Sequence, residues 1–94
     1  MKKYRSRTEI IALILEAANQ RDGVLKIKIM YAASITSKQL YDYLPFLLKN
    51  DLVEYSGQKG RAYRITRKGM HFLQVYNQLR EMVGTKRLEN VNIL

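Results

Sequence analysis

The chain has 94 residues and a mass of 11.0 kDa, which is enough for one small domain. With 47% hydrophobic residues and a single proline, its composition is that of a folded protein and excludes an intrinsically disordered one. The absence of cysteine excludes disulfides, thiolate metal sites and cysteine nucleophiles. No apolar run reaches the ~18 residues that span a bilayer and no signal-peptide core is present, so a cytoplasmic protein without membrane contact is expected.

Basic residues exceed acidic ones by 17 to 8, which gives a net charge of +9 and an isoelectric point near 10.0. Residues 1–31 carry a net charge of +4, whereas residues 32–55 carry −1. Residues 56–69 hold no acidic residue and five basic ones, namely Lys59, Arg61, Arg64, Arg67 and Lys68. Such a cluster is either a solvated face or an anion-binding surface. Because five uncompensated charges repel one another, the cluster favours a polyanionic partner.

Two helices are predicted in the first third of the chain. Ser6 followed by Glu9 is a capping-box pattern ahead of apolar residues at helical spacing, which predicts a helix over roughly 7–20 ended by Gly23. The alternation in residues 26–29 is compatible with a short strand. Ile27, Met30 and Tyr31 also share one helical face, and a short helix over about 26–33 is preferred.

A third helix follows Thr36 or Ser37, either of which can cap it. Pro45 predicts a kink near residues 41–45 or two short helices in succession, and Asn50 is expected to end the helix in a left-handed conformation. The expected buried stripe is Leu40, Tyr43, Leu44, Leu47 and Leu48. The expected outward residues are Lys38, Tyr41, Asp42, Pro45 and Lys49.

Residues 52–56 and 61–66 are β-type runs on either side of a Gly-Gln-Lys-Gly loop, which predicts a hairpin. Tyr63 and Ile65 are expected on one side of the second strand, opposite Arg64. Thr66 can cap a last helix over about 67–83, ended by Gly84, and residues 85–94 have no clear periodicity. The expected fold class is α+β and mostly α, in one domain over residues 1–94 with a core over about 5–66 and a tail over 84–94.

Several segments together resemble the small archaeal winged-helix DNA-binding proteins, which include chromatin-type members that dimerise through a C-terminal helix. The resemblance covers about residues 5–73 and lies in the spacing of all the segments. They are Arg-Ser-Arg-Thr-Glu-Ile-Ile at 5–11, Lys-Ile-Lys-Ile-Met-Tyr at 26–31, Ser-Lys-Gln-Leu at 37–40, Tyr-Leu at 43–44, Asp-Leu-Val-Glu at 51–54 and Tyr-Arg-Ile-Thr-Arg-Lys-Gly at 63–69. It implies a winged helix-turn-helix of three helices and a two-stranded wing, followed by a dimerisation helix. It also implies a nucleoid-associated transcriptional regulator or chromatin-type protein that binds double-stranded DNA.

Each predicted element has an expected role on DNA. The start of the third helix enters the major groove, the hairpin lies along phosphates or in the minor groove, and the start of the second helix contacts phosphates. No arginine lies on the third helix, so phosphate contacts should dominate and sequence preference should be modest. For each single residue, facing water or covering the core is the competing interpretation. The candidate DNA-binding residues are Lys26, Lys28, Ser37, Lys38, Gln39, Tyr41, Lys59, Arg61 and Arg64.

Catalysis finds no support in the sequence. It contains no glycine-rich phosphate loop, and Asp42, Asp51 and Glu54 are interpreted as surface acids. The single histidine, His71, is interpreted as packed or half-exposed. We therefore expect a non-enzyme without metal, cofactor or small-molecule substrate. The alternative function is a winged-helix module that binds an acidic protein or RNA within a larger assembly, against which the basic hairpin argues.

The last helix is expected to form the interface of a homodimer. Four of its apolar residues recur at spacings of four, three and four, which is a two-heptad seam. Val75 and Met82 widen this seam, whereas Met70 and Leu73 are assigned to the core of the protomer. The alternative is a monomer in which the tail, Leu88–Leu94, folds over the seam. The expected interface residues are Phe72, Tyr76, Leu79 and Val83.

Overall fold

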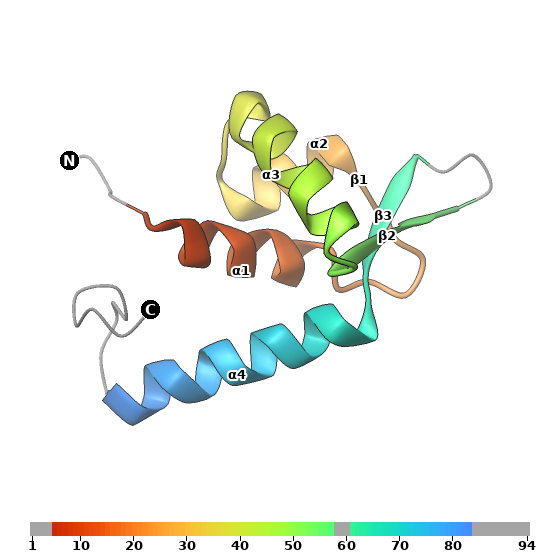
Figure 1. Cartoon of the computed structure of the whole chain (residues 1–94). Helices are drawn as coiled ribbons and strands as arrows, with labels where there is room; N and C mark the ends of the chain where they lie inside the picture. Colours follow the sequence, from red (N-terminus) through yellow and green to blue (C-terminus); the bar gives the residue numbers. More distant parts are fainter. Residues whose placement is uncertain (1–4, 58–60, 84–94) are drawn as a thin grey trace.

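The computed structural model describes residues 5–57 and 61–83 of the chain. Within these residues, four helices and a small antiparallel sheet form an α+β fold that is mostly α, as expected from the sequence (Figure 1). The elements are α1 (Arg7–Ala17), β1 (Val24–Leu25), α2 (Lys26–Ala33), α3 (Ser37–Lys49), β2 (Val53–Ser56), β3 (Ala62–Ile65) and α4 (Arg67–Val83).

Side-chain caps fix the starts of α1 and α3. The backbone amide of Glu9 donates to Ser6 Oγ at 3.0 Å, and the Gln39 amide donates to Thr36 Oγ1 at 3.1 Å. Gln39 Oε1 accepts the Thr36 amide in return, which completes a capping box. The caps expected at Ser6 and Thr36 are confirmed. Helix α1 ends at Ala17, three residues earlier than expected, because the Ala18 carbonyl accepts the Ile65 amide of β3 at 3.0 Å.

Helix α2 covers the predicted range, but β1 precedes it and was not predicted. Helix α3 runs unbroken from Ser37 to Lys49, which rules out two short helices in succession, while the alternative of a kink near residues 41–45 stays a prediction. Pro45 lies within it on the exposed side. Asp51, with φ 62°, adopts the left-handed conformation that was expected of Asn50, whose φ is −91°. The Asn50 side chain instead donates to the Phe46 carbonyl at 2.9 Å, which satisfies a group at the helix end.

The sheet has three strands in the order β1–β3–β2, all antiparallel, where two strands were expected. Tyr63 in the central strand pairs with Val24 of β1 on one side and with Tyr55 of β2 on the other. Tyr63 and Ile65 are buried, as the alternation along β3 predicted. The third strand escaped prediction because a two-residue strand has no periodicity of its own.

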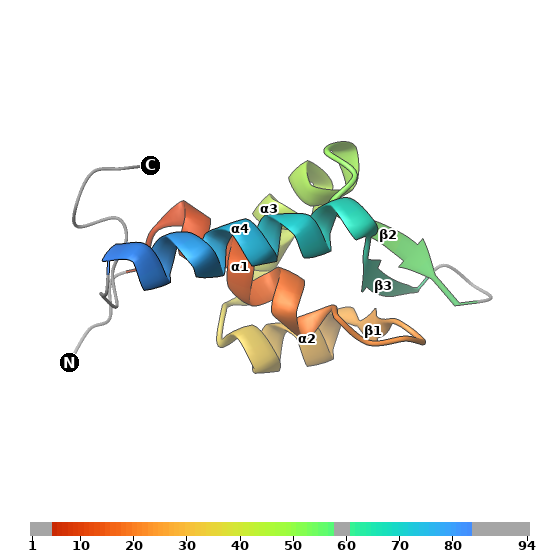
Figure 2. The same cartoon turned by 90° about the horizontal axis from the view of Figure 1, so that it is seen from below.

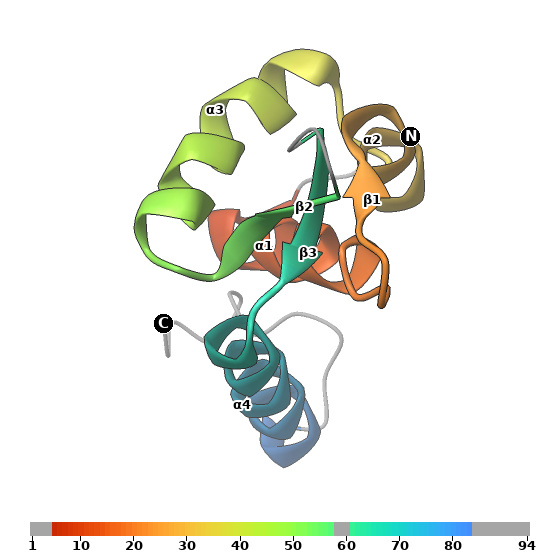
Figure 3. The same cartoon turned by 90° about the vertical axis from the view of Figure 1, so that its right-hand side faces the viewer.

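The predicted last helix is confirmed over its full range, and its end at Gly84 and the tail lie outside the described residues. The Gly69 amide donates to Thr66 Oγ1 at 2.9 Å, which confirms the expected cap. A side chain at Gly69 would collide with the Leu52 carbonyl, so the first turn of α4 packs closely on the chain before β2. Helix α4 then runs along α1 (Figure 2), on the opposite side of the domain from α3 (Figure 3).

The core lies where α1, α2, α3 and the sheet meet. From α3 it takes Leu40, Leu44 and Leu47, which are buried as expected, while Tyr43 and Leu48 are half-buried. This packing leaves the opposite side of α3 to solvent, and that side holds the candidate binding residues Ser37, Lys38 and Tyr41.

Candidate nucleic-acid interface

The start of α3 presents polar side chains to solvent. Ser37, Lys38 and Tyr41 are exposed, and Tyr41 keeps 77% of its surface accessible. Lys38 Nζ lies 3.4 Å from Asp42 Oδ2 in an exposed pair one helical turn apart. Such pairs contribute only about 0.3–0.5 kcal/mol, so the ammonium group remains available to another anion. Gln39 is half-buried and its carbonyl oxygen serves the capping box, so its amide nitrogen is the group left for a base edge.

The start of α2 lies on the same face of the molecule. Lys26 and Lys28 are exposed, and α2 follows Leu25, whose aliphatic side chain cannot cap the free amides of the first turn. Lys26, Lys38 and Tyr41 line one cavity together with Tyr55 of β2. The starts of α2 and α3 and the strand β2 therefore open onto a single surface, which we call the front face.

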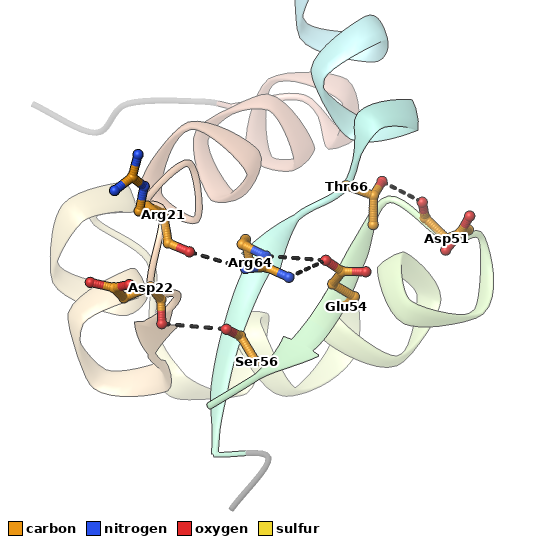
Figure 4. A network of polar contacts seen from close by, with 7 residues as sticks. All are labelled: Arg21, Asp22, Asp51, Glu54, Ser56, Arg64 and Thr66. Carbon is orange, nitrogen blue, oxygen red and sulfur yellow. Dashed lines mark hydrogen bonds and ion pairs between the residues drawn. The ribbon is translucent and has the colours of Figure 1, made fainter. Parts of the chain in front are cut away.

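The basic residues of the hairpin divide into two groups. Arg61 is exposed directly before β3, and Lys59 lies outside the described residues. Arg64 is half-buried and its Nε and Nη2 donate to Glu54 Oε2 at 3.1 and 2.8 Å (Figure 4). Its Nη1 donates to the Arg21 carbonyl at 3.1 Å, so one guanidinium joins β3 to β2 and to the loop after α1.

Other cations bind the carboxyl ends of helices. Lys68 Nζ donates to the Asn50 carbonyl at 3.0 Å, at the end of α3. Arg5 Nη1 donates to the Ala33 carbonyl at 2.8 Å and to the Ser34 carbonyl at 3.1 Å, at the end of α2. Cations are favourable at these positions because helix ends carry partial negative charge. The expectation that all five charges of residues 56–69 are uncompensated is wrong, since Arg64 and Lys68 have partners within the protein.

Two exposed tyrosines were missed by sequence reasoning. Tyr55 keeps 60% of its surface accessible and its ring centroid lies 5.3 Å from that of Tyr63. Tyr31 on α2 is 73% exposed. Burial, and then the neighbouring Tyr55, raise the pKa of the Tyr63 phenol above its ordinary value. The contact between Tyr55 and Tyr63 depends on the register of β2 against β3. The composition of the loop between these strands did not define that register.

The apolar stripe that was predicted on α4 packs largely against the core of its own protomer. Tyr76 is only 7% exposed and its ring stacks on Phe72, with 6.4 Å between centroids. Leu79 and Val83 also pack partly against the core. The expectation that this seam is left over by the domain core is wrong, because α4 turns it toward α1. Met70, expected in the core, is 51% exposed.

Features that would bind a metal ion or span a membrane are absent from the described residues. Within residues 5–57 and 61–83, no group of three or more His, Cys, Asp or Glu side chains is placed to hold a metal ion. His71 is exposed on α4, more so than expected. In the same described segments, no helix is long and apolar enough to cross a membrane.

Comparison with known families decides the class of the fold. A family model described as a winged helix-turn-helix matches residues 4–84. The chain belongs to the winged helix-turn-helix family. Within this family's architecture, α2 and α3 form the helix-turn-helix unit, and β2 and β3 form the wing.

A solved structure supports the same fold. The chain is similar to the crystal structure of Sso10a-2, a DNA-binding protein from Sulfolobus solfataricus, with a TM-score of 0.68. The sequence identity is 23%, and the match covers 96% of this chain and 97% of that chain. A comparison with curated proteins gave no match. The winged-helix fold expected from the sequence is therefore confirmed.

Proposed function

We propose that this winged helix-turn-helix protein binds double-stranded DNA through its front face. The observation that carries the proposal is that exposed cations from α2 and α3, Lys26 and Lys38, line one concave surface with Tyr41. Arg61 extends the positive charge along the wing. A surface of this kind attracts a polyanion and releases its counterions on binding.

In the proposed complex, the first turn of α3 enters the major groove. Ser37, Lys38 and Gln39 face base edges there, and Tyr41 packs on sugar or on a thymine methyl group. Lys26 and Lys28 contact phosphates beside the free amides of α2, and the wing residues Lys59 and Arg61 contact phosphates or the minor groove. Arg64 contributes by holding the wing strands together, because Glu54 and Arg21 occupy its guanidinium. Without an arginine on α3, binding depends mainly on phosphates, as in a regulator or chromatin-type protein of modest sequence preference.

Membership of the winged helix-turn-helix family supports this proposal. So does the likeness to Sso10a-2, whose description names it as a DNA-binding protein. The competing function, a module that binds an acidic protein or RNA, would use the same charges. Duplex DNA is favoured because an exposed helix start can enter the major groove while a basic wing contacts the neighbouring phosphates or minor groove.

Fluorescence anisotropy with a labelled duplex tests the proposal. The Lys38→Gln/Arg61→Gln double variant should bind about 20–30-fold more weakly at ~0.15 M salt, because one cation in the major groove and one at the phosphates no longer neutralise DNA charge. Arg80→Gln is a control that removes a charge from α4 on the opposite side of the domain, over the Tyr76 ring. It should leave duplex affinity within about twofold, since exposed charges beyond a Debye length are screened. Equal losses in the double variant and the control would contradict the front face as the binding surface.

We further propose that the protein acts as a homodimer through α4, with an interface that differs in part from the one predicted from the sequence. Of the residues predicted at the interface, Phe72 and Leu79 remain half-exposed, while Val75 is 39% and Met82 is 80% exposed. These four recur at spacings of three, four and three, which is a heptad seam along one flank of the helix. Val83 lies beside the flank, and Tyr76 supports it from within the core. A dimer would present two front faces to one duplex or to two.

Light scattering tests the dimer. A Val75→Glu/Met82→Glu variant should be monomeric at tens of micromolar while the parent is dimeric, because two carboxylates would be buried in the seam. Met70→Glu is the matched control, since Met70 is an exposed apolar residue on a different side of α4. A monomeric parent contradicts the dimer. A dimeric double variant would move the interface away from this flank.

A further inference from the structure

An open cavity runs along one side of α3 on the front face. Its volume is about 650 Å³, within the ~300–1,000 Å³ of sites that hold small molecules. Three residues of α2, seven of α3 and the tyrosines of β2 and β3 line it. The cavity is therefore built by every element of the helix-turn-helix and the wing, and it adjoins the residues proposed to read DNA.

The floor and walls of the cavity suit a planar ring. Leu40 and Leu44 of α3 are 2% and 5% exposed and form part of an apolar floor. Tyr41 and Tyr55 line the cavity with 77% and 60% of their surfaces accessible, and Tyr63 is buried against Tyr55. In the free protein, the apolar surface of two aromatic side chains around this floor stays in contact with water. A flat aromatic molecule packed on these rings would bury that surface.

The charged groups around the cavity are all positive. Among the described residues that line the cavity, only Lys26 and Lys38 are ionised, and Ser37 adds a hydroxyl group. On α3 the polar lining residues come first, in the first turn, and those that follow are apolar apart from the Tyr41 hydroxyl. The ion pair of Lys38 with Asp42 is exposed and weak, so an anionic ligand can displace it.

We propose that this cavity is a binding site for a small planar aromatic anion, such as an aromatic carboxylate or sulfonate. Its ring packs on Tyr41 and Tyr55 above the apolar floor, and its anionic group lies at the ammonium groups of Lys26 and Lys38. An unpaired nucleic-acid strand is the competing occupant. It is disfavoured because a strand needs cations along its whole track, whereas Lys38, in the first turn of α3, is the only cation that this helix contributes to the described lining of the cavity.

Occupancy of the cavity should oppose duplex binding, an expectation that rests on the proposed function. Lys26, Lys38 and Tyr41 belong both to the cavity and to the surface proposed to contact DNA. A bound anion would neutralise the two lysines and occupy the space beside the recognition helix. By linkage, DNA would weaken binding of the anion by the same factor.

Anilinonaphthalene sulfonate (ANS), an aromatic anion whose fluorescence rises in apolar sites, is a direct probe for the folded full chain. It should bind the parent saturably at one site per protomer. Tyr41→Ala and Tyr55→Ala should each weaken binding about tenfold, because each removes an aromatic contact. Tyr31→Ala is the matched control, since Tyr31 is 73% exposed on α2 but does not line the cavity. All three replace exposed residues, and thermal unfolding confirms that each variant is folded.

The charge of the ligand is tested separately. Neutral phenylnaphthylamine should bind the parent more weakly than ANS, and the Lys26→Gln/Lys38→Gln variant should lose this preference. Benzoate or indole acetate should displace ANS. Unchanged ANS affinity in both the Tyr41 and Tyr55 variants, or an equal loss in the Tyr31 variant, overturns the site. Displacement by oligothymidylate but not by aromatic carboxylates overturns the proposed ligand class.

Duplex DNA is added last, with binding of the duplex followed by anisotropy in the same sample. Displacement of ANS by bound duplex supports the coupling between the two ligands. Duplex that binds without displacing ANS contradicts the coupling and leaves duplex binding itself intact. ANS that binds at Tyr41 and Tyr55 in a protein that fails to bind duplex supports the cavity site and contradicts the proposed function.

Discussion

Cations in two regions of this molecule have opposite surroundings. On the front face and the adjoining wing, Lys26, Lys38 and Arg61 are exposed to solvent. Where the wing strands and helix ends meet, Arg64 and Lys68 donate hydrogen bonds to carboxylate and carbonyl oxygens of the protein itself. The two regions hold the same residue types, yet only the first has charge available for a partner.

Net charge therefore overstates the binding surface of a basic domain. An arginine with three donated hydrogen bonds must lose them before it can contact a phosphate, which offsets what the contact would contribute. A solvated lysine loses only water and counterions. The front face should therefore govern affinity for DNA, and the second region should govern the stability of the wing.

The largest effect is expected for the variant Lys26→Gln/Lys38→Gln/Arg61→Gln. Loss of three cations that neutralise DNA charge should weaken duplex binding about 100-fold at ~0.15 M salt. The midpoint of thermal unfolding should stay within about 2 °C of the parent, since exposed side chains contribute little to stability. Anisotropy and calorimetry on the same samples check both numbers. A large fall in the unfolding midpoint would show that these residues support the fold. That result would contradict the separation of cations that bind DNA from cations that stabilise the wing.

A smaller effect, on stability and not on DNA affinity, is expected for Arg64→Gln. The unfolding free energy should fall by about 1 kcal/mol, because the ion pair with Glu54 is half-exposed and solvent screens it. For a domain of this size the unfolding midpoint should drop by about 4–8 °C. Glu54→Gln completes a double-mutant cycle measured by thermal unfolding. Arg64→Gln at full stability but with a tenfold loss of DNA affinity would place Arg64 on the binding surface after all.

The smallest effect concerns Tyr63 at high pH. Burial raises the pKa of its phenol above the ordinary 10.0, so the folded protein holds this proton more tightly than the unfolded chain. Stability contributed by the neutral phenol is present below pH 10.0 and is lost as the pH rises through the folded pKa. Tyr63→Phe should therefore lose less stability than the parent between about pH 9 and 11. Denaturant unfolding across this pH range measures the difference, and identical pH profiles would contradict it.

Much of the fold followed from local signals in the sequence. The range of α4 and the caps at Ser6, Thr36 and Thr66 could be predicted because each depends on residues within one turn. Strand β1 and the early end of α1 could not be, because both depend on partners in β3, about 40 residues away along the chain. Local patterns carry no information about such long-range hydrogen bonds.

The candidate site was predicted less completely, for the same physical reason. The exposure of Lys38 and Tyr41 followed from the helical stripe of α3, which spacing defines. The role of Arg64 depends on Glu54, which only the strand register brings opposite it. In the same way, the seam of α4 was assigned to a second protomer because its packing on α1 is invisible in the sequence.

The salt dependence of duplex binding shows whether the solvated cations of the front face bind DNA. If 4–6 phosphates are contacted, log affinity against log salt should have a slope of about −4 to −5 per protomer. The slope should become less steep by about 2.7 in the Lys26→Gln/Lys38→Gln/Arg61→Gln variant and stay unchanged in Arg64→Gln. A parent slope near zero would contradict DNA binding by these cations and favour a protein-interaction module.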